Sequence, residues 1–358
     1  MSTAHRDQAL DALLHPYADG LLRWPPQGDL AVDGALFLRA REGAALHAVG
    51  ARGFSCTQPF KPEVDRLQRI GAELVDEDAL PAATYPLVLV LPPRQREEAR
   101  ALLAKACMAV APGGIVIAAV ANDEGAKSRE ADLKQLAGNL AVISKHHCRV
   151  FWTRPDAVFD AALLAQWAKS DAPRVQRSAE VPGGEFQTRP GVFAWDRVDA
   201  ASKMLAEALP TDLRGRVGDF GAGWGYLSMQ VLARCKQVTS LDLYEADARS
   251  LALADENLGD AHLPVHCHWH DVTRGVDERF DVIVCNPPFH ALGRGDRPDI
   301  GRAFIAAAAN ALKPVGRLWL VANRHLPYEQ ALGDGFAQVN TVAQNGGFKI
   351  VEATKAAR

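Results

Sequence analysis

Two segments of the chain resemble each other, and this duplication is the strongest constraint on how the chain can fold. Residues 85–123 and residues 280–325 both contain an apolar strand, a Pro-Pro pair, a helical segment, a short turn, a second strand and the tripeptide Val-Ala-Asn. Strands that are apolar throughout are typical of parallel sheets covered on both faces. Helical segments between such strands indicate βαβ units. The sequence therefore predicts two doubly wound α/β domains of similar topology.

The length of 358 residues agrees with two domains. We place the boundary in the stretch 182–191, which is rich in proline and glycine and continues neither a helix nor a strand pattern. This choice gives domains at residues 1–180 and 181–358. In the C-terminal half, five strands alternating with helices are predicted to end in an antiparallel hairpin, whose turn is formed by Asn345, Gly346 and Gly347.

Composition narrows the class of protein. No stretch approaches the roughly 18 consecutive apolar residues of a membrane helix, and the first residues lack the apolar run of a signal peptide. Six scattered cysteines without a Cys-x-x-Cys pair are typical of free thiols in a reducing compartment. We therefore expect a cytoplasmic protein without a membrane partner. Because the net charge is −3, any contact with nucleic acid must rest on local clusters of Lys and Arg.

The first predicted strand of the C-terminal half ends near Asp219 and continues into three alternating glycines, Gly221, Gly223 and Gly225. Glycines let the backbone turn tightly and approach a ligand, because no Cβ stands in the way. The helix predicted after them offers free N–H groups in its first turn. The spacing differs from the dinucleotide motif Gly-x-Gly-x-x-Gly. Taken alone, it is equally compatible with a strand-to-helix turn that binds nothing.

The next two predicted strands end in acidic residues that suit a nucleoside. Glu245, at the tip of the second strand, could accept hydrogen bonds from both hydroxyls of a ribose, whereas Asp242 lies further inside the strand. Asp271, at the end of the third strand, could read an adenine edge together with the N–H of Val272. An exposed acid at a strand end needs no ligand. In combination with the glycines, however, these residues and Asp219 form a predicted cofactor-binding set.

Three histidines alternate near the third strand, at positions 266, 268 and 270, and a strand would place them on one face. This arrangement raises the alternative of a metal site. Alternating histidines more often lie on a solvated edge strand, and we expect no acidic or cysteine partner near these three. The sequence therefore predicts no metal.

The fourth predicted strand ends in the most specific motif of the chain, formed by Asn286, Pro287, Pro288, Phe289 and His290. The exocyclic amine of a nucleobase is a poor nucleophile, because its lone pair is conjugated into the ring. The Asn286 side-chain oxygen and the Pro287 carbonyl could accept its N–H groups and turn the lone pair toward an electrophile. The prolines stiffen the loop, and Phe289 could stack on a flipped base. We expect Asn286, Pro287 and Phe289 to be catalytic, Pro288 and His290 to bind substrate, and Asn286 also to border the cofactor.

In this order, the glycines, Glu245, Asp271 and the Asn-Pro-Pro-Phe-His motif resemble the bacterial ribosomal RNA guanine-N2 methyltransferase family over nearly the full chain. Further matching segments are residues 189–205, 321–329 and 345–350. The length and the N-terminal half resemble the small-subunit (16S) enzymes more than the large-subunit ones. Two departures, Phe220 beside the first glycine and Glu245 in place of Asp, are compatible with cofactor binding.

The resemblance implies two tandem class I (Rossmann-like) methyltransferase domains, with S-adenosylmethionine as cofactor and ribosomal RNA or a ribosomal subunit as partner. It also implies that only the C-terminal domain is active, and we expect a monomer. The N-terminal copy agrees: the counterpart of Asn286 is Leu91, and residues 36–46 contain one glycine where a glycine loop would be needed.

For the RNA contact we single out Arg294 and Arg297, in the glycine-containing segment after the motif, because Lys and Arg make most phosphate contacts. A second basic cluster, residues 145–154, is explained equally well as a solvated face above core aromatics. The Asn-Pro-Pro-aromatic motif leaves large-subunit RNA, DNA adenine and protein glutamine open as substrates. A nucleotide-dependent oxidoreductase is disfavoured, because the sequence lacks the glycine motif that such an enzyme needs. A non-catalytic RNA-binding protein is also disfavoured, because the C-terminal motifs are intact.

Overall fold

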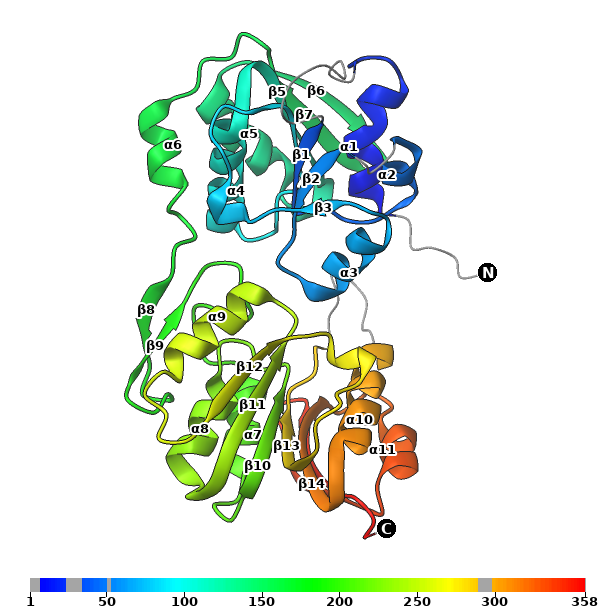
Figure 1. The fold of residues 1–358 in the computed structure, drawn as a ribbon, viewed down its shortest axis with the longest axis vertical. Coiled ribbons are helices and arrows are strands. Elements are labelled where there is room, and N and C mark those ends of the chain that lie inside the picture. The colour runs from blue at the N-terminus through cyan, green and yellow to red at the C-terminus, as the bar shows by residue number, and fades with distance from the viewer. Residues whose placement is uncertain (1–6, 24–33, 50–52, 289–297, 358) are drawn as a thin grey trace. The chain divides into compact units, whose positions relative to one another are not determined.

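The computed structural model describes residues 7–23, 34–49, 53–288 and 298–357. The chain divides into two compact units, Met1–Ala172 and Pro173–Arg358, and the boundary expected at residue 180 falls shortly after the start of the second unit. Each unit contains a mostly parallel seven-stranded sheet with helices on both faces and an antiparallel hairpin at one edge (Figure 1). The predicted fold class of two tandem doubly wound domains is confirmed.

The N-terminal unit has the strand order β3-β2-β1-β4-β5-β7-β6. Its strands are β1 (Ala35–Leu38), β2 (Phe54–Thr57), β3 (Glu73–Leu74), β4 (Tyr85–Val90), β5 (Val110–Ala121), β6 (Leu140–Lys145) and β7 (Cys148–Thr153). Its helices are α1 (Gln8–Ala18), α2 (Ala44–Val49), α3 (Lys61–Arg69), α4 (Arg96–Ala109), α5 (Ala126–Ala137) and α6 (Ala161–Trp167), with short 3-10 turns η1 (Glu77–Ala79) and η2 (Asn122–Glu124).

The C-terminal unit repeats this order as β12-β11-β10-β13-β14-β16-β15. Its strands are β10 (Arg214–Phe220), β11 (Gln237–Glu245), β12 (Val265–Trp269), β13 (Phe280–Cys285), β14 (Leu312–Asn323), β15 (Gln338–Asn345) and β16 (Phe348–Thr354). Its helices are α7 (Ala200–Ala208), α8 (Tyr226–Arg234), α9 (Ala248–Asn257), α10 (Pro298–Ala311) and α11 (Glu329–Gly335), with a 3-10 turn η3 (Val272–Arg274). The predicted hairpin is confirmed as β15 and β16, and Gly346 and Gly347 have φ of 57° and 88°.

The sheet of the C-terminal unit is buried on both faces, as its apolar strands predict. One face packs against α7, α8 and α9 through side chains such as Leu205, Val231 and Ala254. The other face packs against α10 and α11, where Ile305 and Leu332 are buried. Because all strands from β10 to β14 are parallel, their carboxyl ends meet at one edge of the sheet, where the predicted site residues stand.

Two local predictions were wrong. The stretch 182–191 was expected to contain no regular structure, but β9 (Glu185–Thr188) pairs there with β8 (Arg174–Arg177) in an antiparallel ribbon. The strand has only four residues, of which Phe186 is a buried aromatic. The glycines and prolines on either side therefore outweighed its strand pattern in the sequence. The third βα unit contains η3 instead of an α-helix, because only residues 270–279 separate β12 from β13.

Candidate functional site

The glycine loop follows β10 and takes a backbone path that favours glycine. Gly221, Gly223 and Gly225 have φ of 80°, 56° and 94°, in the region that other residues rarely adopt. A Cβ on Gly221 would also lie 3.4 Å from the Phe304 ring and 3.6 Å from the carbonyl oxygen of Asn286. The loop therefore lies close to the end of β13, where the Asn-Pro-Pro motif begins.

Glu245 holds this loop from the end of β11. Its Oε2 accepts a hydrogen bond from the N–H of Gly223, and its Oε1 accepts one from the N–H of Asp247, each at 2.8 Å. Burial raises the pKa of the Glu245 carboxyl, although these backbone donors oppose the rise. A carboxylate has about four lone-pair positions. Both oxygens therefore keep capacity for further donors, such as a pair of ribose hydroxyls.

Asp219 lies at the end of β10 and is fully buried. Its Oδ2 accepts a hydrogen bond from the Ser228 hydroxyl at 2.8 Å, whereas its Oδ1 has no hydrogen-bond partner among the described residues. Burial raises the pKa of the Asp219 carboxyl to about 7. A buried acceptor without a partner is costly, and a bound group with N–H donors or positive charge fits this position.

Asn286 follows β13 and is fixed by the segment that begins α7. Its Nδ2 donates to Asp199 Oδ2 at 3.1 Å and to Ser202 Oγ at 2.8 Å. Of the two prolines that follow, Pro287 is buried and Pro288 is exposed. A single cleft is lined by Gly221, Gly223 and Asn286, together with Asp199, Ser202 and Phe193. The structure thus brings the predicted cofactor loop and the predicted amine-binding residue to one place.

The other predicted site residues either make local contacts or lie outside the described residues. Asp271 caps η3, with Oδ1 accepting from the N–H and the hydroxyl of Thr273 at 3.0 and 2.6 Å, and Val272 is buried. This local role leaves the adenine contact of both residues as a prediction. The remaining four, Phe289, His290, Arg294 and Arg297, lie outside the described residues.

Sequence reasoning missed several residues that shape this site. Asp199 caps α7 by accepting the N–H of Ser202, and an Asp directly before a helical segment is a sequence signal of a helix start that could have drawn attention to Asp199. Asn257, at the end of α9, donates to the Trp224 carbonyl at 2.9 Å and bonds to the backbone of Gln187 in β9. The ribbon that was expected to be a linker therefore supports the glycine loop.

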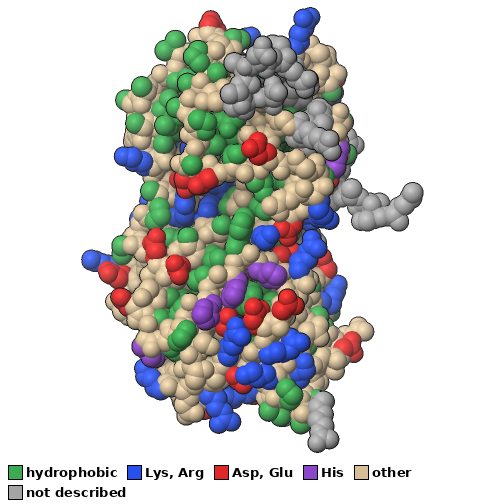
Figure 2. All heavy atoms as spheres, in the orientation of Figure 1, with side chains coloured by type: hydrophobic (Ala, Val, Ile, Leu, Met, Phe, Trp, Pro, Cys, Tyr) green, Lys and Arg blue, Asp and Glu red, His purple; other side chains and the backbone are tan. Residues whose placement is uncertain are grey.

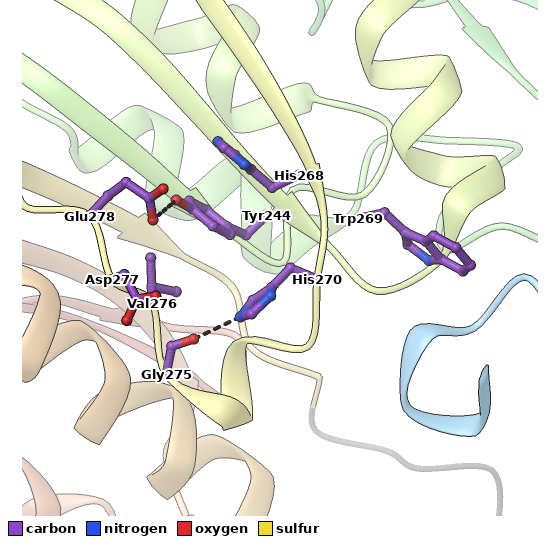
Figure 3. Close-up of a pocket in the computed structure, with 8 residues that line it drawn as sticks. All are labelled: Tyr244, His268, Trp269, His270, Gly275, Val276, Asp277 and Glu278. Carbon is purple, nitrogen blue, oxygen red and sulfur yellow. Dashed lines mark hydrogen bonds between the residues drawn. The ribbon is translucent and has the colours of Figure 1, made fainter. Parts of the chain in front are cut away.

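A larger hollow of the C-terminal unit lies elsewhere, beside β11 and β12 (Figure 3). It encloses about 310 Å³, against about 50 Å³ for the cleft at Asn286. In Figure 3, Tyr244 stacks on His268 and donates to Glu278 at 2.7 Å, while His270 contacts the Gly275 carbonyl at 2.7 Å. We assign the site to the smaller cleft, because the glycine loop and Asn286 line it, whereas none of the predicted site residues lines the larger hollow.

The structure also shows which residues surround the three histidines. His268 lies 3.1 Å from Asp242, so the expectation that no acidic residue is near was wrong. Burial alone would raise the pKa of Asp242, but hydrogen bonds from Arg216 and His268 outweigh it and lower the pKa. Asp242 is thus engaged inside the sheet, and Glu245 remains the acid at the strand tip. Across the described ranges, no group of three His, Cys, Asp or Glu side chains is arranged to hold a metal ion.

The N-terminal unit shows what replaces the site in the other copy. Strand pairing matches Leu38 with Val90 and Phe220 with Cys285, so Leu91 stands at the position of Asn286 and Arg39 at that of Gly221. The same comparison places Gln58 at the position of Glu245.

Arg39 also has a positive φ, of 57°, but it carries a long side chain into a buried ionic cluster. Its guanidinium lies 3.1 Å from Glu77 and 3.2 Å from Glu98. Leu91 is buried in the core and offers no acceptor. In the basic cluster at 145–154, Phe151 and Trp152 are buried core residues and are not available for stacking on a base.

The chain is similar to known proteins over most of its length. Residues 183–352 match the methyltransferase small domain family. A ribosomal RNA small subunit methyltransferase C of Psychromonas ingrahamii is 30% identical over 270 residues, which cover 75% of each chain. One of Erwinia tasmaniensis is 30% identical over 267 residues, or 74% of each chain. The chain belongs to the ribosomal RNA small subunit methyltransferase C family. This confirms the resemblance seen in the sequence, including its preference for the small-subunit branch.

A solved structure extends the match to the whole fold. The T. thermophilus 16S rRNA N2 methyltransferase, solved in complex with AdoMet and guanosine, superposes with a TM-score of 0.80 at 25% identity. The superposition covers 99% of this chain and 93% of that one. The chain is therefore a methyltransferase built from two copies of one fold. Among the residues that the structure describes, no helix is long and apolar enough to span a membrane.

Proposed function

We propose that the C-terminal unit transfers the methyl group of S-adenosylmethionine to the exocyclic N2 of a guanine in small-subunit ribosomal RNA. The observation that carries this proposal is the cleft shared by the glycine loop and Asn286. It places a loop suited to a nucleoside cofactor beside an amide that can accept the protons of an amine. The relatives, which are named for small-subunit ribosomal RNA, support the choice of polymer.

The residues of the cleft fit S-adenosylmethionine. Gly221, Gly223 and Gly225 allow close approach of a ligand, and Glu245 keeps acceptor capacity for ribose hydroxyls. The buried Oδ1 of Asp219 fits the positive charge of the cofactor. Asp271 and Val272 are proposed to read the adenine, and Asn286 to border the methyl group. When bound, the cofactor supplies an electrophilic methyl group on a sulfonium.

The Asn286 oxygen and the Pro287 carbonyl are proposed to accept the two N–H groups of the guanine amine. This contact draws the nitrogen lone pair out of conjugation and orients it. As the new N–C bond forms, the bond between the methyl carbon and the sulfonium sulfur would break, and one amine proton would be released to water. Phe289 is proposed to stack on the base, with Pro288 and His290 as further substrate contacts.

RNA contacts are proposed at Arg294 and Arg297. Support comes from charge: acidic and basic side chains are interspersed on the face shown in Figure 2, so phosphate contacts must come from local groups. The N-terminal unit is proposed to take part in folding or RNA presentation and not in chemistry, because Arg39, Gln58 and Leu91 replace the three central site residues.

Two further expectations belong to the proposal. The enzyme acts as a monomer, since one C-terminal unit carries all the proposed site residues, and sedimentation at working concentrations tests this. It acts in the cytoplasm, which agrees with six free cysteines.

Transfer of tritium from labelled S-adenosylmethionine tests the proposed reaction. The substrates are naked 16S RNA, assembled small subunits, large-subunit RNA, adenine-containing DNA and glutamine-containing protein. We expect label in N2-methylguanosine after nuclease digestion of small-subunit RNA. Label in 6-methyladenine of DNA, in a protein or only in large-subunit RNA would contradict the proposal. Mapping of methylated guanines in a deletion strain then identifies the nucleotide.

A further inference from the structure

The orientation of the Asn286 amide decides whether the site can accept an amine. An amide has nearly the same shape when its oxygen and nitrogen exchange places, so only its hydrogen bonds select one orientation. With the oxygen toward the substrate, Asn286 accepts an N–H. With the NH2 toward the substrate, two donors face each other and the amine is repelled.

The described contacts use both hydrogens of the Asn286 NH2 group. One is directed at Asp199 Oδ2, at 3.1 Å, and the other at Ser202 Oγ, at 2.8 Å. The two acceptors differ in what they permit. The Ser202 hydroxyl can donate or accept and would satisfy either orientation of the amide. A carboxylate only accepts, so a flipped Asn286 would place oxygen against oxygen at Asp199.

Asp199 is itself held in place. The same Oδ2 accepts the N–H of Ser202 at 2.8 Å and so caps the first turn of α7. The acceptor is therefore fixed by the backbone of a helix whose capping residue lies 87 residues before Asn286 in the sequence. This coupling gives the helix cap a second role at the end of β13.

We infer that Asp199 is a positioning residue, which fixes the Asn286 amide with its oxygen toward the substrate amine. The inference rests on the proposed function, because it assumes that Asn286 receives an amine. Asp199 acts through Asn286 and forms no bond to the reacting atoms. Ser202 supports the same NH2 group without selecting its orientation.

A pair of substitutions separates this role from helix capping. Asn, Asp and Ser are similarly good N-caps, so both Asp199→Asn and Asp199→Ser should fold with nearly the wild-type melting temperature. In Asp199→Asn, the cap bond keeps an oxygen where Oδ2 now lies, and that oxygen can still accept from Asn286. In Asp199→Ser, the side chain is shorter and its hydroxyl can also donate, so selection is lost.

We expect kcat of Asp199→Ser to fall roughly tenfold or more, as for loss of one hydrogen bond that selects the amide orientation. Asp199→Asn, which keeps an accepting oxygen, should stay within about threefold of wild type. The dissociation constant for S-adenosylmethionine should be unchanged in both. Asp160→Ser is the matched control, because Asp160 caps α6 of the N-terminal unit through Leu163 in the same way. It should leave kcat unaltered.

Selective ¹⁵N labelling of asparagine gives a readout that does not need activity. The side-chain signal absent from Asn286→Asp identifies Asn286. Its NH2 protons should exchange slowly in wild type and in Asp199→Asn, and quickly in Asp199→Ser. Equal exchange in all three proteins, equal kcat for the two variants, or weaker cofactor binding alongside the loss of kcat would overturn the inference. Absence of RNA methylation by the wild type, with the exchange pattern as expected, would instead refute the proposed function.

Discussion

Glu245→Gln tests the cofactor site most directly, because it removes a charge while keeping the shape of the side chain. In the structure, both carboxylate oxygens accept backbone N–H bonds, from Gly223 and Asp247, and keep capacity for two ribose hydroxyls. Glutamine has one acceptor oxygen, which can accept from only one of the two backbone N–H groups and the hydroxyl beside it. Its NH2 group would face the donors that the other carboxylate oxygen now accepts. At least one hydrogen bond from a hydroxyl to a charged acceptor is then lost.

Such a bond contributes about 1.5–3 kcal/mol, which corresponds to a dissociation constant for S-adenosylmethionine that is roughly 10- to 150-fold weaker. Isothermal titration calorimetry measures this constant, and circular dichroism confirms that the variant is folded. Gln58→Ala is the matched control, because Gln58 holds the equivalent position in the N-terminal unit and should not affect affinity. A folded Glu245→Gln protein that binds within twofold of wild type would show that Glu245 only supports the loop.

Three further predictions follow from the site. Asn286→Ala should lower turnover roughly 10²–10³-fold, as for loss of one preorganised polar contact, with little change in cofactor affinity by calorimetry; Leu91→Met, which conserves core volume, should leave the rate unchanged. Joint charge reversal of Arg294 and Arg297 should weaken RNA binding and reduce the slope of log affinity against log salt by about one per lost phosphate contact; an unchanged slope would place the RNA surface elsewhere. Burial raises the pKa of Asp219 to about 7, so the folded state binds an extra proton between about pH 4 and pH 7, and the free energy of unfolding should fall as the pH rises through that window. Asp219→Asn should remove this fall and gain about 2–3 kcal/mol over wild type between about pH 5 and pH 8 in urea titrations; parallel curves for the two proteins would refute the assignment.

The strand-end residues could be predicted from the sequence because a parallel sheet brings the ends of its strands together. Strand patterns in the sequence located β11 and β13, and residues at or just beyond the ends of such parallel strands must meet at one edge. Glu245 and Asn286 were found in this way. The same reasoning fails for partners that lie on other elements. No local pattern shows that Asp199 reaches Asn286, or that Asn257 bonds to Trp224, since these contacts exist only after the helices have packed.

The two units of this chain keep the same fold although the residues at the matched site positions differ. In both, the loop after the first strand is tied to the second by a backbone bond, from Ala222 to the Tyr244 carbonyl at 3.2 Å and from Ala40 to the Thr57 carbonyl at 3.1 Å. Any residue except proline can donate such a bond, so the scaffold survives most changes of sequence. The proposed chemistry instead depends on which residue occupies each of three matched positions, which are Gly221 and Arg39, Glu245 and Gln58, and Asn286 and Leu91.

At the first of these positions, both units keep the left-handed backbone, with φ of 80° at Gly221 and 57° at Arg39. The N-terminal unit therefore retains the backbone path of the loop but does not retain the space that would let a ligand approach it closely. In the N-terminal unit, the space beside the loop is used by the Arg39 side chain and its ion pairs with Glu77 and Glu98. Substitution of Arg39 by glycine alone would not restore a cofactor site there. Glu77 and Glu98 would lose the guanidinium that now pairs with them. Gln58 and Leu91 would still lack the acceptors that the chemistry requires.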